Sequence, residues 1–277
     1  MAPPRSRTDS TLRRLCAALG WNRSSYFLLS LLAATAVVVV IVWWPLVEEQ
    51  LAYFDPGRPW WVQTDWLLLG TFAAMSLLIM AGADLRRDAL VVLVGLGGGL
   101  VIESWGTQTE LWVYYTQQRP PLWIIPAWPI ASLAIDRLVR LLDRLAPRGA
   151  AYRWAYWPLL AGFYTLEVCF AWPTRGRSLT VMALALSLLL ILTPTDHRKA
   201  VLTFIAGSAL GYFLERWGTT RACWTYYTQQ TPPLFAVLAH GFAALAFWRV
   251  GELARACPKA WRTRERRAHA DGAVDAE

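Results

Sequence analysis

Long apolar runs alternate with short polar segments along the whole chain. The apolar runs, several of which approach or exceed 18 residues, cover residues 26–47, 66–83, 89–105, 121–138, 154–172, 179–192, 200–217 and 233–250. An apolar helix of roughly 20 residues is long enough to cross a lipid bilayer. The pattern therefore predicts an all-α integral membrane protein with eight transmembrane helices.

One stretch of sequence occurs twice, in residues 95–123 and 207–235, and each copy begins within an apolar run, the third and the seventh. Without gaps, the following residues each recur 112 positions later: Gly95, Gly99, Glu103, Trp105, Gly106, Thr107, Trp112, Tyr114, Tyr115, Thr116, Gln117, Gln118, Pro120, Pro121 and Leu122. Such identity indicates a tandem duplication. Because each copy carries four spans, we expect two parallel four-helix repeats that share one orientation and are related by a pseudo-twofold axis along the membrane normal.

Polar segments divide the chain into five parts. We expect a basic N-terminal segment (1–25), a first repeat (26–141), a linker (142–153), a second repeat (154–251) and a basic tail (252–277). The first apolar run is too long for the core of a signal peptide, so it is interpreted as an uncleaved span.

Charge gives the orientation. All but six of the 27 Lys and Arg residues fall on one side of the predicted topology, which places both termini and the linker in the cytoplasm. The strong preference for Arg over Lys indicates a bacterial source, so we expect a multi-pass inner-membrane protein. The formal charge of +8 is attributed to these cytoplasmic segments, which would attract anionic lipid headgroups rather than nucleic acid.

Four ionisable residues within the spans are the candidate catalytic groups. Glu103 and Glu215 each end a Gly-x3-Gly-x3-Glu pattern, which puts the two glycines and the carboxylate on one helix face. Close packing at the glycines would turn each Glu towards protein rather than lipid. Glu167 and His240 are expected at the same depth, near the outer face. A structural alternative is that each Glu accepts hydrogen bonds from the Trp and Tyr side chains of its own loop.

Aromatic and amide side chains of the repeated outer loops are the candidate substrate-binding residues. They are Trp105, Trp112, Tyr114, Tyr115, Gln118, Trp217, Trp224, Tyr226, Tyr227 and Gln230. Aromatic rings beside amides suit a sugar, a cationic headgroup or a polyene. An interfacial aromatic belt is the simpler alternative for most individual rings.

No cofactor is predicted, because the chain has no Gly-rich phosphate loop and no nucleophile elbow. No metal site is predicted either, since HExxH, CxxC and DDxxD motifs are missing. The four cysteines are scattered and are expected to be unpaired thiols.

One stretch resembles a known family. The order Glu103, Gly106, Thr107, Trp112, Tyr114, Tyr115, Pro121, Leu122, Pro126 and Trp128 is similar to a segment of the membrane carotenoid-biosynthesis hydratases, multi-span proteins that add water to terminal double bonds of carotenoids. The likeness covers about thirty residues of each half, and the second half has Leu238 and His240 in place of Pro126 and Trp128. The resemblance implies an isoprenoid-type substrate, with Glu103 or Glu215 as proton donor.

Three functions fit these observations. The first is binding of an amphipathic lipid or isoprenoid near the outer face, with acid-catalysed hydration, isomerisation or cyclisation of an alkene. The second is a non-catalytic membrane partner or assembly factor that docks another membrane protein through its outer loops. The third is a proton- or cation-coupled transporter or flippase, against which stands the clustering of the acids at one end of the spans.

Overall fold

The computed structural model describes residues 16, 17 and 19–274, with residues 257–274 described by their backbone alone. The described chain is mostly helical, which confirms the predicted helical class. The first-half elements are α2 (Arg23–Val42), α3 (Trp44–Ala52), α4 (Trp60–Gln63), α5 (Trp66–Met80), α6 (Leu85–Gln108), β1 (Trp112–Tyr114) and α7 (Ala127–Leu145). The second-half elements are α8 (Ala151–Ala171), the 3-10 turn η1 (Trp172–Thr174), α9 (Ser178–Ile191), α10 (His197–Thr220), β2 (Trp224–Tyr226) and α11 (Leu234–Val274).

Each predicted span contains a helix, although the helix of the fourth span, α7, begins at Ala127 and not at Pro121. The helices differ in whether they are long and apolar enough to cross a membrane. Three described segments are long and apolar enough to do so, namely Arg23–Val42, Leu85–Gln108 and Leu234–Ala256. Helices α5 and α9 are apolar but have only 15 and 14 residues, which is short for a hydrocarbon core about 30 Å thick. The first predicted span is interrupted at Trp43, where α2 gives way to α3.

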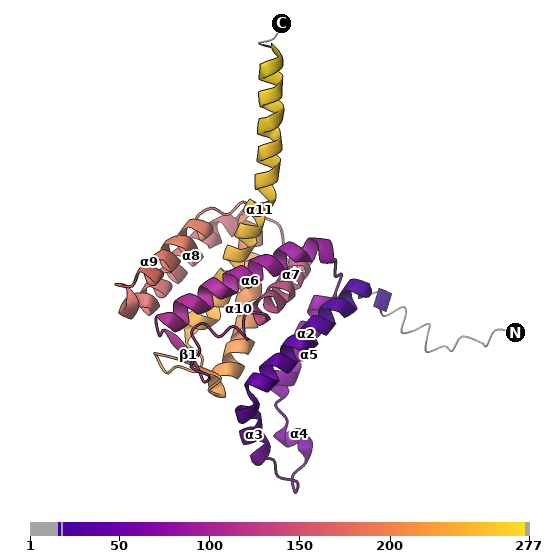
Figure 1. Cartoon of the computed structure of the whole chain (residues 1–277), viewed down its shortest axis with the longest axis vertical. Helices are drawn as coiled ribbons and strands as arrows, with labels where there is room; N and C mark the ends of the chain where they lie inside the picture. The colour runs from indigo at the N-terminus through magenta and orange to yellow at the C-terminus, as the bar shows by residue number, and fades with distance from the viewer. Residues whose placement is uncertain (1–15, 18, 275–277) are drawn as a thin grey trace, which may run out of the picture.

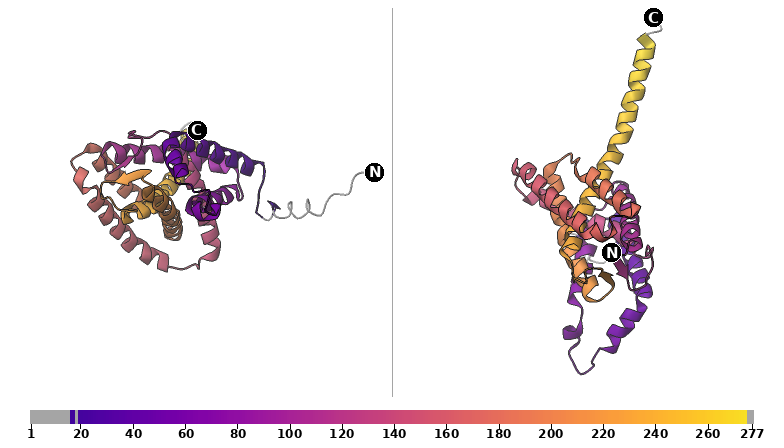
Figure 2. Two further views of the ribbon diagram at one scale, coloured as in Figure 1. Left: turned by 90° about the horizontal axis from the view of Figure 1, so that it is seen from below. Right: turned by 90° about the vertical axis from the view of Figure 1, so that its left-hand side faces the viewer.

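Helices α6, α7, α10 and α11 pack against one another in the middle of the molecule. Figure 1 shows α8 and α9 on one side of this group and α2 with α5 on the other. The distal part of α11 projects from one end, whereas α3 and α4 project from the opposite end, and the second view in Figure 2 shows the same separation.

Helices α6 and α10 begin and end at corresponding residues of the two copies. Each has 24 residues, and each is started by an aspartate whose side chain accepts a backbone N–H of the first turn, Asp84 from Arg86 and Asp196 from Lys199, both at 3.0 Å. An Asp in this position satisfies one of the unpaired donors at a helix start.

The repeated loops, which show no strand periodicity in the sequence, pair with each other. Strands β1 and β2 are antiparallel, and their register joins Trp112 to Tyr226, Val113 to Thr225 and Tyr114 to Trp224. Both loops must therefore lie at the same end of the molecule. The indole of Trp112 lies 5.9 Å from the Tyr226 ring, and Tyr114 lies 5.8 Å from Trp224, so the cross-strand partners are also in aromatic contact.

The repeated tryptophans at the ends of α6 and α10 join each half to the other. Trp105 Nε1 donates to Thr180 Oγ1 on α9 at 3.2 Å, and Trp217 Nε1 donates to Asp65 Oδ2 at the start of α5 at 2.9 Å. Each of these bonds joins one half to the other, so the repeated tryptophan of each copy finds its hydrogen-bond acceptor in the opposite half.

Asp65 is also paired with Arg221, whose Nε lies 2.6 Å from Asp65 Oδ2. Burial raises the pKa of the Asp65 carboxyl, but hydrogen bonds from the Leu68 backbone and from the Arg221 and Trp217 side chains lower it by more, and the net pKa lies below the usual value. Asp65 is therefore ionised at neutral pH.

A second inter-helix ion pair is buried near the start of α6. Arg137 on α7 donates from Nη1 to Asp88 Oδ1 at 3.0 Å and from Nη2 to Asp88 Oδ2, and both side chains are almost fully buried. The corresponding residues in the second half are Ala200 and Arg249, so this pair belongs to the first half alone. Arg137 also contacts Asp136, which is paired with Arg140.

We expect Asp88→Ala to destabilise the folded protein by about 3–5 kcal/mol, because the change leaves the Arg137 guanidinium buried without its main acceptor. Thermal unfolding in detergent measures this. The double variant Asp88→Ala/Arg137→Leu removes both charges and should recover most of the loss. A double variant as unstable as the single one would contradict the assignment.

Candidate functional site

Each repeated loop folds back onto the helix that precedes it. After α6 ends, Glu110 takes a left-handed backbone conformation (φ 62°), and the Leu111 N–H donates to the Gly106 carbonyl at 2.9 Å. Ala222 (φ 53°) and Cys223 do the same after α10, where the Cys223 N–H reaches the Gly218 carbonyl at 2.9 Å. A left-handed residue after the last turn is a common way to end a helix.

Glycine is required at the two helix positions, Gly106 and Gly218, against which the tryptophan rings of the loops pack. The Trp112 ring lies where a side chain at Gly106 would be, since a Cβ there would lie 1.8 Å from a ring carbon. At Gly218 the corresponding distance to the Trp224 ring is 1.9 Å. The repeated Gly and Trp are thus a matched pair in each copy.

This return brings three donors to Glu103. Trp112 Nε1 donates to Glu103 Oε2 at 3.1 Å, Tyr114 Oη donates to Oε1 at 2.8 Å, and Trp128 Nε1 on α7 donates to Oε1 at 3.2 Å. Glu103 is 3% exposed, so its carboxyl is enclosed by protein and both oxygens have partners.

Glu215 has nearly the same surroundings. Trp224 Nε1 and Tyr226 Oη each donate to it at 3.0 Å. His240 replaces Trp128 as the third neighbour, with Nδ1 3.8 Å from Glu215 Oε1. That separation is too long for a hydrogen bond, and His240 Nδ1 instead lies 2.9 Å from the Ala236 carbonyl, to which it donates.

Glu103 and Glu215 therefore make the contacts of the structural alternative considered from the sequence. In both glutamates, each carboxyl oxygen accepts a hydrogen bond from the Trp or Tyr of the following loop, so the carboxyl holds that loop against the helix. It has little capacity left to engage a second molecule.

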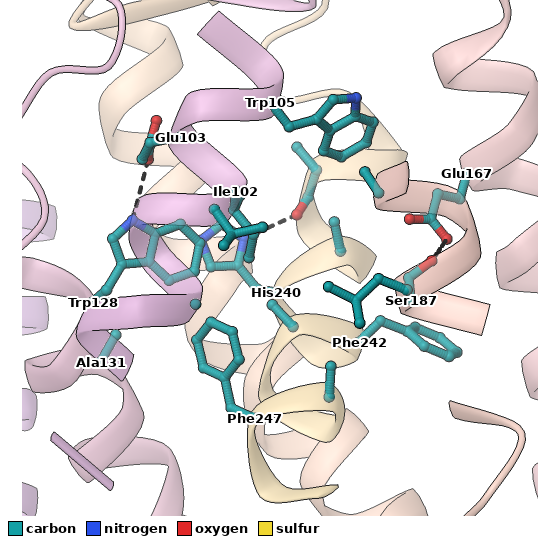
Figure 3. Close-up of a pocket in the computed structure, with 18 of the residues that line it drawn as sticks. Ile102, Glu103, Trp105, Trp128, Ala131, Glu167, Ser187, His240, Phe242 and Phe247 are labelled. Atoms are coloured by element: carbon teal, nitrogen blue, oxygen red, sulfur yellow. Dashed lines mark hydrogen bonds between the residues drawn. The ribbon is translucent and has the colours of Figure 1, made fainter. Parts of the chain in front are cut away.

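A cavity of about 610 Å³ lies beneath the strand pair. Most of its lining comes from α6, α9 and α11, and α7, α8 and α10 contribute the rest together with the repeated loops. Its volume falls within the roughly 300–1,000 Å³ range of small-molecule sites. Most of its lining is apolar, and all four predicted catalytic residues, Glu103, Glu167, Glu215 and His240, contribute to it. In Figure 3, Glu103 with Trp128 and Glu167 with Ser187 lie on opposite sides, and His240, Phe242 and Phe247 of α11 lie between them.

Glu167 differs from the other two glutamates because its carboxyl is only partly satisfied. Ser187 Oγ on α9 lies 3.1 Å from Glu167 Oε2 and also 3.1 Å from the Leu184 carbonyl, so its single proton serves one acceptor at a time. Glu167 Oε1 accepts no hydrogen bond from the residues that the structure describes. It is the acid in the cavity that is free to meet another molecule.

The predicted substrate-binding residues separate into two groups. Those that line the cavity are Trp105, Trp112, Tyr114, Trp224 and Tyr226. Those that lie outside it are Tyr115, Gln118, Trp217, Tyr227 and Gln230.

Residues of the second group have structural contacts or face the exterior. The Tyr115 hydroxyl donates to the Val42 carbonyl at the end of α2, and the Tyr227 hydroxyl donates to the Phe170 carbonyl near the end of α8 at 2.8 Å. Gln118 and Gln230 are exposed. These tyrosines fasten the loops to the neighbouring helix ends.

Sequence reasoning missed three features of this site. Trp128 belongs to the stretch that carries the resemblance and corresponds to His240, but nothing in the sequence predicts that its indole binds Glu103. Ser187 is a single hydroxyl in an apolar helix, which is a weak signal. Phe163 and Phe242 stack at 3.8 Å along the wall of the cavity, and phenylalanines within apolar runs carry no signal of their own.

No group of three or more His, Cys, Asp and Glu side chains within the described residues is placed to hold a metal ion. Cys16, Cys169 and Cys223 are free thiols, and Cys257 lies outside the described side chains.

We expect Gly106→Ala to destabilise the protein by about 1–3 kcal/mol, because the new methyl group collides with the Trp112 ring and displaces it from Glu103. Tryptophan fluorescence and thermal unfolding in detergent report both effects. Gly149→Ala is the matched control, since no atom lies within 4 Å of a Cβ at that position. Equal stability of the two variants would contradict the proposed fit.

Comparison of the chain with protein-family models, with curated proteins and with solved structures finds no match in any of the three.

Proposed function

We propose that this chain is a multi-pass inner-membrane protein that binds an amphipathic lipid, of the isoprenoid class, in the cavity beneath the paired loops. The observation that carries the proposal is the cavity itself, a space with mostly apolar walls and one carboxylate, Glu167, that has an unused acceptor. An apolar chain would be stabilised along the walls. The resemblance of the repeated stretch to carotenoid hydratases points to the same ligand class.

The membrane arrangement belongs to this proposal. Eight spans form two parallel four-helix repeats, and the pairing of β1 with β2 at one end supports a shared orientation. That end faces outward, and both termini lie in the cytoplasm, where the basic segments meet anionic headgroups.

The exposed side chains at the edge of the cavity support entry from the bilayer. Leu93 and Val101 on α6 and Leu186 on α9 line the cavity and are 65%, 50% and 46% exposed. In the proposed orientation these residues face acyl chains, so a lipid-soluble ligand reaches the cavity sideways without crossing water.

Acid-catalysed alkene chemistry is the reaction that this arrangement supports best. An apolar site favours the neutral form of a carboxyl group, which is the form that donates a proton. Transfer of that proton to an alkene gives a carbocation, which aromatic faces such as Phe163 and Phe242 can stabilise. Water then adds to the cation and loses a proton to the carboxylate, which gives a hydrate, or the cation itself loses a proton to the carboxylate, which gives an isomer. Glu167 takes the acid role that the resemblance assigned to Glu103 or Glu215.

Extraction and mass spectrometry of lipids from the purified protein test the binding. We expect a bound isoprenoid in the native protein and a loss of most of it in Gly97→Phe, because Gly97 lines the cavity and a side chain there enters open space. Gly162→Phe is the control, since it adds the same ring to an exposed position of α8 away from the cavity. No bound lipid, together with a co-purifying membrane protein, would instead favour the docking function.

The roles of the glutamates can be separated. We expect Glu167→Gln to lower conversion of an isoprenoid alkene about 10²–10⁴-fold at unchanged thermal stability, which is the usual effect of removing a general acid. Glu103→Gln should mainly lower the unfolding temperature, because in either orientation of the amide its NH2 group faces at least one of the three donors that the carboxyl oxygens accept from. Product analysis and thermal unfolding of both variants give the answer, and the reverse assignment would return the acid role to Glu103.

A docking function is the second candidate, and one observation favours it. The carboxylates that recur in both copies, Glu103 and Glu215, serve the rigidity of the loops. A rigid outer surface that exposes Gln117, Gln118 and Gln230 is suited to recognition by another membrane protein.

A further inference from the structure

The two halves of the duplication differ most where the cavity lies. On α6 the cavity wall includes Gly98 and Ile102. The residues 112 positions later, on α10, are Leu210 and Leu214, and Leu214 also lines the cavity. A Cβ at Gly98 would lie 2.0 Å from a carbon of the Phe247 ring, so that ring packs against this glycine. The open space on this face of α6 lies beside Gly97, where no atom lies within 4 Å of a Cβ.

The place in the first half that corresponds to the cavity is filled. Helices α6, α8, α9 and α11 supply much of the cavity lining, and α7 and α10 complete it. The counterparts of the first four helices are α10, α2, α5 and α7. Side chains of those four helices form one packed apolar cluster, to which Leu210 and Leu214 contribute together with Leu28, Met75, Ile79 and Leu133. A chain-like ligand has no corresponding space there.

Two polar residues of the cavity, Glu167 and Ser187, have no polar counterparts in the first half. Ser187 corresponds to Met75, 112 residues earlier. Glu167 corresponds to Val39 when Trp44-Pro45 is aligned with Trp172-Pro173. The structure supports this alignment, because it also matches Val42 with Phe170, the two carbonyls that accept from Tyr115 and Tyr227.

The unsatisfied atoms indicate what the ligand offers. Glu167 Oε1 has no donor among the described residues. In the neutral carboxyl, Oε2–H can donate to Ser187 Oγ while that hydroxyl donates to the Leu184 carbonyl, so Oε1 is an acceptor in the neutral form as well as in the ionised form. His240 Nδ1 donates to the Ala236 carbonyl, so in the neutral ring Nε2 is an acceptor. The cavity therefore presents spare acceptors to a ligand, and a hydrogen-bond donor in an apolar site is stabilised only by meeting one.

We propose that the chain binds one ligand molecule, that this molecule is a long-chain isoprenoid alcohol, and that its hydroxyl donates to Glu167 while its chain fills the space beside Gly97. The inference rests on the proposed function and specifies its ligand and stoichiometry. The corresponding helices of the first half have Val39 and Met75 in place of Glu167 and Ser187, so they do not form a second site of this kind.

Binding to the full-length protein in detergent, followed by native mass spectrometry, tests this with three probes. They are geranylgeraniol, its methyl ether, which retains the oxygen but donates no hydrogen bond, and the hydrocarbon without oxygen. We expect geranylgeraniol to bind at one molecule per chain and about five- to tenfold more tightly than the ether, as the loss of one buried hydrogen bond predicts.

Two variants assign the preference to its residues. Glu167→Val, which installs the first-half residue, should bind alcohol and ether about equally, because the acceptor is gone while the apolar walls remain. Gly97→Phe should lose all three probes, and Gly162→Phe should bind as the native protein does. Thermal unfolding confirms that each variant is folded.

The outcomes distinguish this inference from the proposed function. Equal binding of alcohol and ether by the native protein, or saturation at two molecules per chain, would overturn the inference while leaving a lipid-binding cavity. Failure of all three probes to bind the native protein, with no lipid recovered from it, would overturn both.

Discussion

A buried carboxylate must find hydrogen-bond donors, and this requirement shapes the end of the molecule that carries β1 and β2. Glu103 and Glu215 lie on tightly packed helix faces, and each takes its donors from the Trp and Tyr of its own loop. To supply them, each loop must turn back over a glycine of the preceding helix. Only then do the two loops meet as antiparallel strands and close the cavity from above.

A third buried glutamate, Glu167, is not bound by either loop. Glu103 and Glu215 are occupied by the framework, whereas Glu167 shares a single proton from Ser187 with the Leu184 carbonyl. The duplication thus provides two loops that are each held by a glutamate. The carboxyl and hydroxyl of Glu167 and Ser187 occur in the second half alone. Gly97 on α6 borders open space in the cavity, whereas Leu210 on α10 packs in the apolar cluster of the first half.

Much of the site could be found from sequence because membrane depth restricts where ionisable residues occur. Glu103, Glu167, Glu215 and His240 were predicted at one level, and all four line the cavity. Their roles could not be ranked, since the number of donors at each carboxyl depends on contacts between distant segments. Trp128 reaches Glu103 from α7, and Ser187 reaches Glu167 from α9. Pairing of β1 with β2 was equally hidden, because three residues show no strand periodicity.

The sequence by itself determined the helical class, the duplicated stretch and the candidate acids, since hydropathy, identity at a fixed offset and charge in an apolar run are local properties. Only the tertiary structure decided which carboxylates are tethers and which one is free. It also decided that one of two corresponding places is a cavity. Both depend on how side chains from separate helices fill space and exchange hydrogen bonds, and close packing makes a single glycine or leucine sufficient to open or close a site.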